Sequence, residues 1–334
     1  MNTFGENIRL TIFGESHGQA VGMVLDNFPA GEAIDMNELF KEMQRRAPGG
    51  GETTTARKEA DEPEFISGLL NGHTTGAPLC AIIKNTDVRP SDYHPETPRP
   101  GHADLTAQIR YKGFSDFRGG GPFSGRLTAA MLVAGAVCKQ ALKRRGIEVE
   151  GKVSRVGAAE CSQPNFDFAM KKEILDARAG GDSVGGIIEC SATGAPAGIG
   201  GLMFGGMESR ISQGLFAIPG VKGVEFGAGF EMALMRGSQA NDPIVMEDGR
   251  IYTETNKAGG INGGLTNGMP LVVRCAFRPT PSISREQKTV NLLKCENTTI
   301  RTLGRHDPCI VPRAVPVVEG MLAFCLMDAL CENW

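Results

Sequence analysis

The chain contains few aromatic residues and no long apolar run. Only 6% of its 334 residues are aromatic, and a single tryptophan is present. No stretch approaches the roughly 18 consecutive apolar residues that a membrane-spanning helix needs. The N-terminal MNTFGENIRLT lacks the basic and apolar regions of a secretory signal. These absences predict a soluble, cytoplasmic protein that has no membrane partner.

An excess of charge of one sign is also missing. Lysine and arginine number 35 and the acidic residues 38, so the formal net charge is −3. This balance gives no electrostatic reason to expect binding to nucleic acid or to an anionic membrane surface. An anionic ligand would therefore need a site that is locally basic.

Paired cysteines are absent as well. The nine cysteines form no CxxC pair, and neither they nor the five histidines cluster at the spacing of a zinc site. Several lie in apolar runs, as Cys325 does in AFCLM. We expect free, mostly buried thiols in a reducing compartment and no metal centre.

Glycine, in contrast, is abundant, with 45 residues that often occur in pairs or triplets between periodic segments. This distribution predicts tight loops around a rigid core. The length is compatible with two domains or with one large domain.

Hydrophobic periodicity predicts both strands and helices. Strands are expected at 8–13, 64–70, 79–84, 185–190, 198–204, 222–226 and 271–277. Helices are expected after Asp35, which forms a capping box with Glu38, and at 125–145, 167–179, 207–216 and 316–331. The last helix is apolar on nearly all sides and should be buried. Four prolines exclude regular structure from 89–101.

The most informative stretch is Arg118–Thr128, RGGGPFSGRLT. Glycines that lead into a helix N-terminus allow backbone N–H groups to approach an anion. Ser124 adds a hydroxyl group, and Arg126 adds a guanidinium that binds phosphate through two donors. The stretch matches neither the P-loop nor the dinucleotide fingerprint. Taken alone, a flexible turn before a core helix is an equally good interpretation.

Other polar residues in glycine-bracketed loops add acid–base groups. His17 lies in GESHG directly after a predicted strand, and His102 lies in RPGHAD. Arg45 and Arg46 end a predicted helix, where an anion site and a solvated helix end are equally plausible. Near the C-terminus the candidates are Arg305, His306 and Asp307. Arginines together with histidines suggest a phosphorylated ligand and acid–base catalysis near neutral pH.

Three motifs in this order, GESHG at 14–18, GGGxxSGRxTA at 119–129 and GRHDPC at 304–309, resemble the chorismate synthase family. The resemblance continues through RPGHAD, VKGVEFG, RGSQ and PRAVPVVEGMLA, so it covers essentially the whole chain. It implies an α+β fold, a β-α-β sandwich with the helices in a central layer and the sheets outside. It also implies one catalytic domain spanning 1–334 and assembly as a homotetramer.

The resemblance further implies a reaction and a site. The reaction is the anti 1,4-elimination of phosphate from 5-enolpyruvylshikimate 3-phosphate to give chorismate, which requires reduced FMN without net redox change. His17 would protonate the leaving phosphate, His102 the reduced flavin, and Asp307 would assist removal of the C6 proton. The implied substrate-binding residues are Ser16, Arg45 and Arg46, and no metal is implied. The implied FMN-binding residues are Ser124, Arg126, Pro219, Gly220, Gly263, Arg278, Pro279, Thr280, Pro281, Ser282 and Arg305.

The chain departs from the family pattern mainly by having fewer cationic residues. Ala47 and Glu52 stand where the family has arginines, and Pro122-Phe123 replaces an Arg-Ser pair; Leu127 and Pro219-Gly220 are further departures. We therefore expect weaker binding of FMN or substrate than in a member with the full set. No insertion for a separate NADPH-dependent flavin reductase is visible, and the source of reduced flavin stays open. The alternatives are a flavin oxidoreductase and a non-catalytic flavin- or phosphate-binding paralogue.

Overall fold

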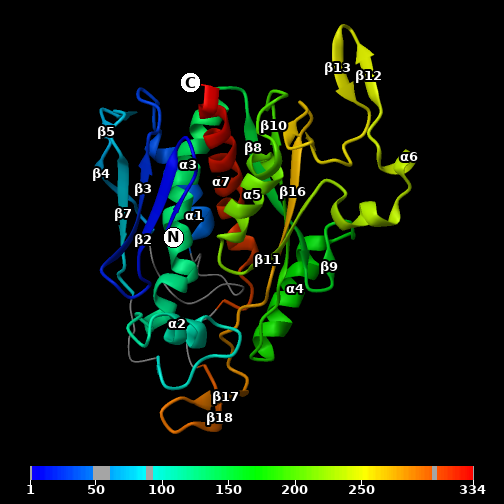
Figure 1. Ribbon diagram of the computed structural model, residues 1–334. Helices are drawn as coiled ribbons and strands as arrows, with labels where there is room; N and C mark the ends of the chain where they lie inside the picture. The colour runs from blue at the N-terminus through cyan, green and yellow to red at the C-terminus, as the bar shows by residue number, and fades with distance from the viewer. Residues whose placement is uncertain (1, 48–60, 88–92, 303–306, 334) are drawn as a thin grey trace.

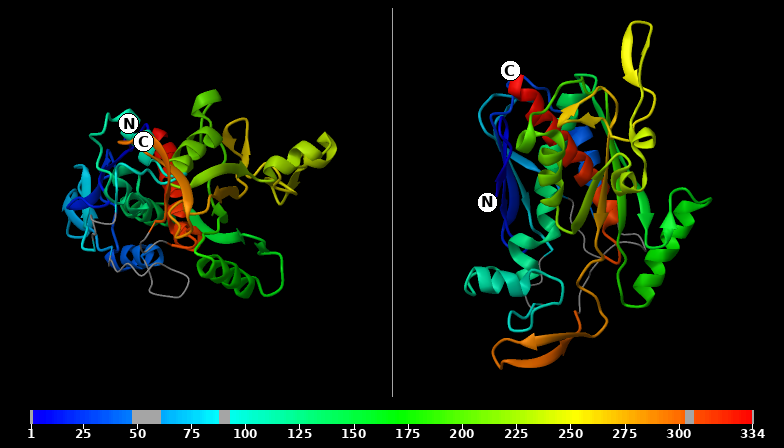
Figure 2. Two further views of the ribbon diagram at one scale, coloured as in Figure 1. Left: turned by 90° about the horizontal axis from the view of Figure 1, so that it is seen from below. Right: turned by 45° about the vertical axis from the view of Figure 1, so that its right-hand side comes forward.

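The computed structural model describes residues 2–47, 61–87, 93–302 and 307–333. Two five-stranded antiparallel sheets form the outer layers of a sandwich whose central layer is helical (Figure 1). This arrangement confirms the β-α-β sandwich expected from the resemblance. Further views show the same layers and the small hairpins that project from them (Figure 2).

The two sheets differ in their place along the chain. The first takes its strands from the N-terminal quarter, in the order β1 (Thr3–Phe4), β2 (Arg9–Gly14), β3 (Ala20–Asp26), β7 (Leu79–Lys84) and β4 (Glu64–Ser67). The second has the order β11 (Val221–Phe226), β16 (Leu271–Phe277), β10 (Gly186–Thr193), β8 (Glu148–Val156) and β9 (Ala159–Glu160). Strand β16 alternates buried and half-buried residues, as expected for a strand with one face against the core.

Four helices occupy the space between the sheets, and three lie elsewhere. The central helices are α1 (Met36–Arg46), α3 (Thr128–Lys143), α5 (Met207–Phe216) and α7 (Val311–Leu330). Helix α4 (Phe166–Ala179) contacts β8 and β9, while α2 (Asp104–Arg110) and the short α6 (Gly237–Ala240) belong to the loops. Asp35 caps α1 as predicted, since its carboxylate accepts the Asn37 and Glu38 N–H groups.

Small antiparallel hairpins extend from the sandwich. Figure 1 shows β12 (Ile244–Glu247) with β13 (Arg250–Thr253) at one end, and β17 (Gln287–Asn291) with β18 (Glu296–Ile300) at the other. The remaining pairs are β5 (Leu69–Leu70) with β6 (His73–Thr74) and β14 (Ile261–Asn262) with β15 (Leu265–Thr266).

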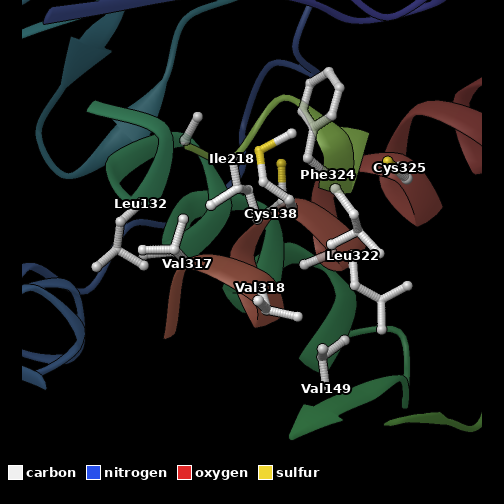
Figure 3. Packing of buried hydrophobic residues seen from close by; sticks show 14 of the residues in the cluster. Leu132, Cys138, Val149, Ile218, Val317, Val318, Leu322, Phe324 and Cys325 are labelled. Carbon is white, nitrogen blue, oxygen red and sulfur yellow. The ribbon is translucent and has the colours of Figure 1, made fainter. Parts of the chain in front are cut away.

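Helix α7 lies at the centre of the core, packed against α3 (Figure 3). Its residues from Val315 to Ala329 are all buried, as the uniformly apolar sequence predicts. The two helix axes approach closely because glycines face each other: a Cβ at Gly135 would lie 2.3 Å from the Cα of Gly320. Among the described residues, no helix is both long and apolar enough to cross a membrane.

One predicted strand does not form, and one predicted helix begins at a different residue. No strand forms at 198–204, where Gly200 has a φ of +114° and makes only an isolated bridge to Leu265. Of the apolar residues that suggested a strand there, Ile199 is buried but Leu202, Met203 and Phe204 are exposed, and Met203–Gly205 is a 3-10 turn. Helix α7 begins at Val311 rather than at Pro316, which lies inside the helix. The apolar strand β3 and the charged strand β8 were not predicted.

Candidate active site

One large cavity, with a volume of about 640 Å³, is lined by loops from all three layers. Its wall is formed by the end of α1, the glycine loop 118–128, the segment from α5 into β11, the segment after β16 and the first turns of α7. Its only lining carboxylate among the described residues is Asp307. The lining cations are Arg46, Arg99, Arg126, Lys222, Arg278 and Arg313. The cavity is therefore locally basic in a chain of near-neutral charge, which suits an anionic ligand.

The glycine loop brings two histidines close to the backbone. Gly119 and Gly120 have φ values of +60° and +85°. A Cβ at Gly119 would lie 2.2 Å from the Cε1 and Nδ1 atoms of His17, and one at Gly120 would lie 2.7 Å from Cε1 of His102. Both positions therefore require glycine, because the backbone φ is positive and because any Cβ would overlap a histidine ring.

His17 is buried beside this loop. Its Nδ1 atom lies 3.2 Å from the Ser16 hydroxyl oxygen, and its ring meets the Tyr93 ring edge-on at 5.1 Å. The Ser16 N–H donates to the carbonyl oxygen of Gly121, which ties this loop to the glycine loop. Ser16 lines the cavity, whereas His17 is not among the lining residues and instead packs against Ser16 and the glycine loop.

His102 also lines the cavity and is held from behind by a carboxylate. Its Nδ1 atom is 2.6 Å from Asp104, which also accepts hydrogen bonds from Arg99. Burial alone would raise the pKa of Asp104, but the hydrogen bonds from Arg99 and His102 outweigh it and hold this pKa well below its usual range. Arg99 also donates to the Ser282 hydroxyl and lies over the Tyr93 ring.

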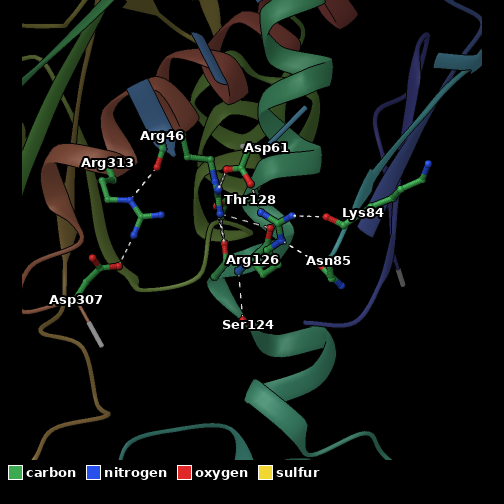
Figure 4. A network of polar contacts seen from close by, with 10 residues as sticks. Arg46, Asp61, Lys84, Asn85, Ser124, Arg126, Thr128, Asp307 and Arg313 are labelled. Carbon is green, nitrogen blue, oxygen red and sulfur yellow. Dashed lines mark hydrogen bonds and ion pairs between the residues drawn. The ribbon is translucent and has the colours of Figure 1, made fainter. Parts of the chain in front are cut away.

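Arg46 and Arg126 line the cavity side by side and share one buried carboxylate, Asp61 (Figure 4). Arg46 also donates to the hydroxyl of Thr128, and Arg126 to the side-chain oxygen of Asn85. Burial lowers the pKa of Arg46 to about 10, a fall that Asp61 opposes and the nearby arginines reinforce. Both arginines are thus fixed in the wall by internal partners.

Arg313, which the sequence analysis did not select, belongs to the same wall. It pairs with Asp307 and donates from Nε to the backbone carbonyl oxygen of Arg46, 2.8 Å away. Its position in the first turn of the buried helix α7 aims it at the cavity. The only sequence signal for it was its place in the PRAVPVVEGMLA motif.

Most of the predicted flavin-binding residues lie together on the cavity wall. Those that line it are Ser124, Arg126, Pro219, Gly220, Arg278, Pro279, Thr280, Pro281 and Ser282. Gly263 does not line it and instead lies in the turn between β14 and β15. Arg305 lies outside the described residues.

Of the predicted substrate-binding residues, Ser16 and Arg46 line the cavity but Arg45 does not. Arg45 turns to the opposite side of α1 and makes two hydrogen bonds of 2.7 Å with Glu319, which raise its pKa. Consecutive residues of a helix point about 100° apart, and in this structure Arg45 turns to Glu319 while Arg46 faces the cavity. Placing Arg45 at the cavity was therefore wrong for this structure.

The residues that depart from the family pattern lie in different parts of the structure. Pro122 and Phe123 line the cavity, Ala47 ends α1, and Leu127 is buried in the core. Glu52 lies outside the described residues. Pro219 and Gly220 also line the cavity, so the departures at 122–123 and 219–220 change the wall itself, and Pro122-Phe123 makes it more apolar.

The residues present fit a flavin phosphate. The wall combines cations with apolar surface from Phe123, Phe216 and Phe277, as a ring system with an anionic tail requires. The hydroxyl oxygen of Thr280 is buried on this wall and has no hydrogen-bond partner among the described residues. Such an atom needs a polar partner, and a bound ligand would supply one. Within the described ranges, no cluster of three His, Cys, Asp or Glu side chains could hold a metal ion.

Comparison with known proteins agrees with the motifs. Residues 8–331 match the family model described as chorismate synthase. The chain is 48% identical to chorismate synthase of Thermococcus kodakarensis, over 98% of this chain and 97% of that protein. It is 46% identical to the Archaeoglobus fulgidus protein of the same name, with 99% and 97% covered. A solved structure titled Crystal Structure of Chorismate Synthase superposes with a TM-score of 0.78 at 29% identity, covering 98% of this chain and 93% of that one.

Proposed function

Because the chain belongs to the chorismate synthase family, we propose that its large cavity converts 5-enolpyruvylshikimate 3-phosphate to chorismate and phosphate by anti 1,4-elimination. The observation that carries this proposal is one cavity whose described wall combines His102, several arginines and a single carboxylate, with His17 packed against the glycine loop that forms part of that wall. The reaction needs these groups, since phosphate leaves from one carbon and a proton is removed from another.

The leaving phosphate would lie against Arg46 and Arg126. Negative charge that builds on a leaving group is stabilised by fixed cations, which need no reorganisation during the reaction. His17 lies beside this wall and would donate a proton to the departing phosphate. Its burial next to Ser16 and Gly119 limits the positions that its ring can take.

Reduced FMN would occupy the part of the cavity formed by Ser124, Pro219–Gly220 and 278–282. When bound, it supplies an electron-rich partner that no side chain offers, without net redox change. Arg278 donates to the carbonyl oxygen of Gly101, and thereby links the flavin wall to the loop that carries His102. His102 would hold or supply a proton at the flavin, and Asp307 would help to remove the C6 proton.

The test is an assay of chorismate formation with anaerobically reduced FMN and 5-enolpyruvylshikimate 3-phosphate. We expect one phosphate per chorismate, with no reductant consumed per product. Consumption of one hydride equivalent per product would favour a flavin oxidoreductase. Tight binding of flavin without turnover would favour a non-catalytic paralogue.

We further propose that the protein forms a homotetramer in the cytoplasm. An arm formed by residues 229–258 exposes large apolar side chains that a monomer would leave in water: Phe230, Leu234, Ile244, Met246 and Ile251. The nine cysteines are all free thiols, which fits a reducing compartment.

A further inference from the structure

Asp61 is a buried carboxylate with no assigned role that touches both arginines of the proposed phosphate wall. Its side chain is fully buried, and its two oxygens are divided between Arg46 and Arg126. It does not itself line the cavity, while both of its partners do. Asp61 therefore lies behind the arginines and can reach a ligand only through them.

Further hydrogen bonds of the two guanidinium groups to described residues go to uncharged atoms. Arg46 donates to the Thr128 hydroxyl and to the Gly125 carbonyl oxygen, and Arg126 to Asn85 and to the Lys84 carbonyl oxygen. Asp61 is thus a carboxylate that both arginines share. Together the three side chains carry a net charge of +1.

We propose that Asp61 is a positioning residue that holds Arg46 and Arg126 side by side and, as their internal counter-ion, limits how strongly this wall binds phosphate. Without the negative charge of Asp61, the two guanidinium groups would repel each other more and attract an anion more strongly. An enzyme that must release phosphate after each turnover gains from a weaker attraction. This inference rests on the proposed function, which places the substrate phosphate at the same wall.

The test compares inorganic phosphate binding, at constant ionic strength, in the full-length wild type and four variants. These are Asp61→Asn, Arg126→Gln, the double variant that combines them, and the control Glu32→Gln. The Arg46–Asp61–Arg126 group by itself carries +1 in wild type, +2 in Asp61→Asn, 0 in Arg126→Gln and +1 in the double variant. Since attraction follows this charge, we expect the dissociation constant to fall at least about fivefold in Asp61→Asn. The double variant should likewise bind phosphate more tightly than Arg126→Gln, and this second comparison holds even if Asp61→Asn alone does not fold.

Glu32→Gln is the matched control. Glu32 also bridges two arginines, Arg144 and Arg145, but none of the three lines the cavity. The Glu32→Gln variant should lose thermal stability without any change in its affinity for phosphate. A merely structural role for Asp61 predicts that Asp61→Asn behaves in the same way.

Two outcomes separate failure of this inference from failure of the proposed site. If wild type binds phosphate and neither Asp61 substitution tightens binding, the counter-ion role is wrong and the site stands. If neither wild type nor Asp61→Asn binds phosphate, the assignment of this wall to phosphate is wrong, and the inference fails with it.

Discussion

At the residue scale, Gly119 and Gly120 occupy positions that only glycine fits. Each has positive φ, and each leaves the space in which a histidine ring lies against the backbone. The loop was predicted to bind an anion through its N–H groups, and the structure adds a second use for the same glycines. The acid–base groups are thereby fixed to the loop that carries Ser124 and Arg126.

This arrangement predicts large effects for the histidine variants. His17→Ala and His102→Ala should each lower turnover by roughly 10²- to 10⁴-fold, which is the usual contribution of a positioned proton donor. Binding of FMN and substrate should change much less, since the arginines stay in place. The measurement is steady-state kinetics with reduced FMN, with the exposed His73→Ala as control. Wild-type turnover in either variant would refute its role as an acid.

At the scale of elements, the contact between α3 and α7 determines how closely the central layer can pack. Gly135 and Gly320 face each other where the helices cross, and no side chain separates their backbones. Helix α7 also carries Arg313, so its position relative to α3 determines where this guanidinium enters the cavity. Helix packing and site geometry are therefore linked.

Gly135→Ala should destabilise the protein although alanine favours helices. The added methyl group would overlap the α7 backbone, a contact that must shift because no flexible side chain can yield. We expect a loss of about 2 kcal/mol in the free energy of unfolding, net of a propensity gain of up to about 1 kcal/mol. Gly237→Ala is the control, since its Cβ would meet no atom within 4 Å. Equal urea midpoints for the two variants would contradict this packing argument.

At the scale of the whole molecule, Glu319 joins four elements across the central layer. From α7 it accepts hydrogen bonds from Arg45 on α1, Lys139 on α3 and the Gly151 N–H on β8. Burial would raise the pKa of Glu319, but these cations outweigh it and lower the pKa below its usual range. This role also explains why Arg45 is not available to the cavity.

The sign of this shift predicts acid sensitivity. A carboxyl with a lowered folded-state pKa contributes stability above its unfolded pKa, about 4.3, and loses it as the pH falls through the folded value. Wild type should therefore lose unfolding free energy below about pH 5. Glu319→Gln should be less stable at pH 7 by about 2 kcal/mol, because Arg45 and Lys139 lose a buried carboxylate partner and keep Glu42. Urea titrations at pH 7 and pH 4 test this, and an unchanged pH slope in the variant would refute it.

The apolar arm leads to a prediction about assembly. Met246 and Ile251 are directly opposed in the β12–β13 hairpin, and both are largely exposed. Met246→Glu combined with Ile251→Glu should reduce the sedimentation mass below that of wild type, because charges resist burial in an interface. The single variant Leu293→Glu, on the exposed turn between β17 and β18, is the control. An unchanged mass would exclude this hairpin from the interface.

The sequence by itself determined the local features of this protein. Periodicity located α5, β7 and β16 because one face of each is buried, and the Asp35 cap was evident because capping depends on neighbours along the chain. The order of the three motifs identified the family, and with it the sandwich, and most of the site residues predicted in this way line the cavity. Strand β3 was missed because both of its faces are apolar, which leaves no alternation to detect.

Only the tertiary structure decided which polar groups act together. Arg45 and Arg46 are adjacent in sequence, yet the helix turns one to Glu319 and the other to the cavity. Asp61 and Arg313 gave little signal, because each acquires its role from a residue far away along the chain, Arg126 for Asp61 and the Arg46 carbonyl group for Arg313. Such pairings depend on where the helices cross and the sheets close, and that is set by the packing of the whole core.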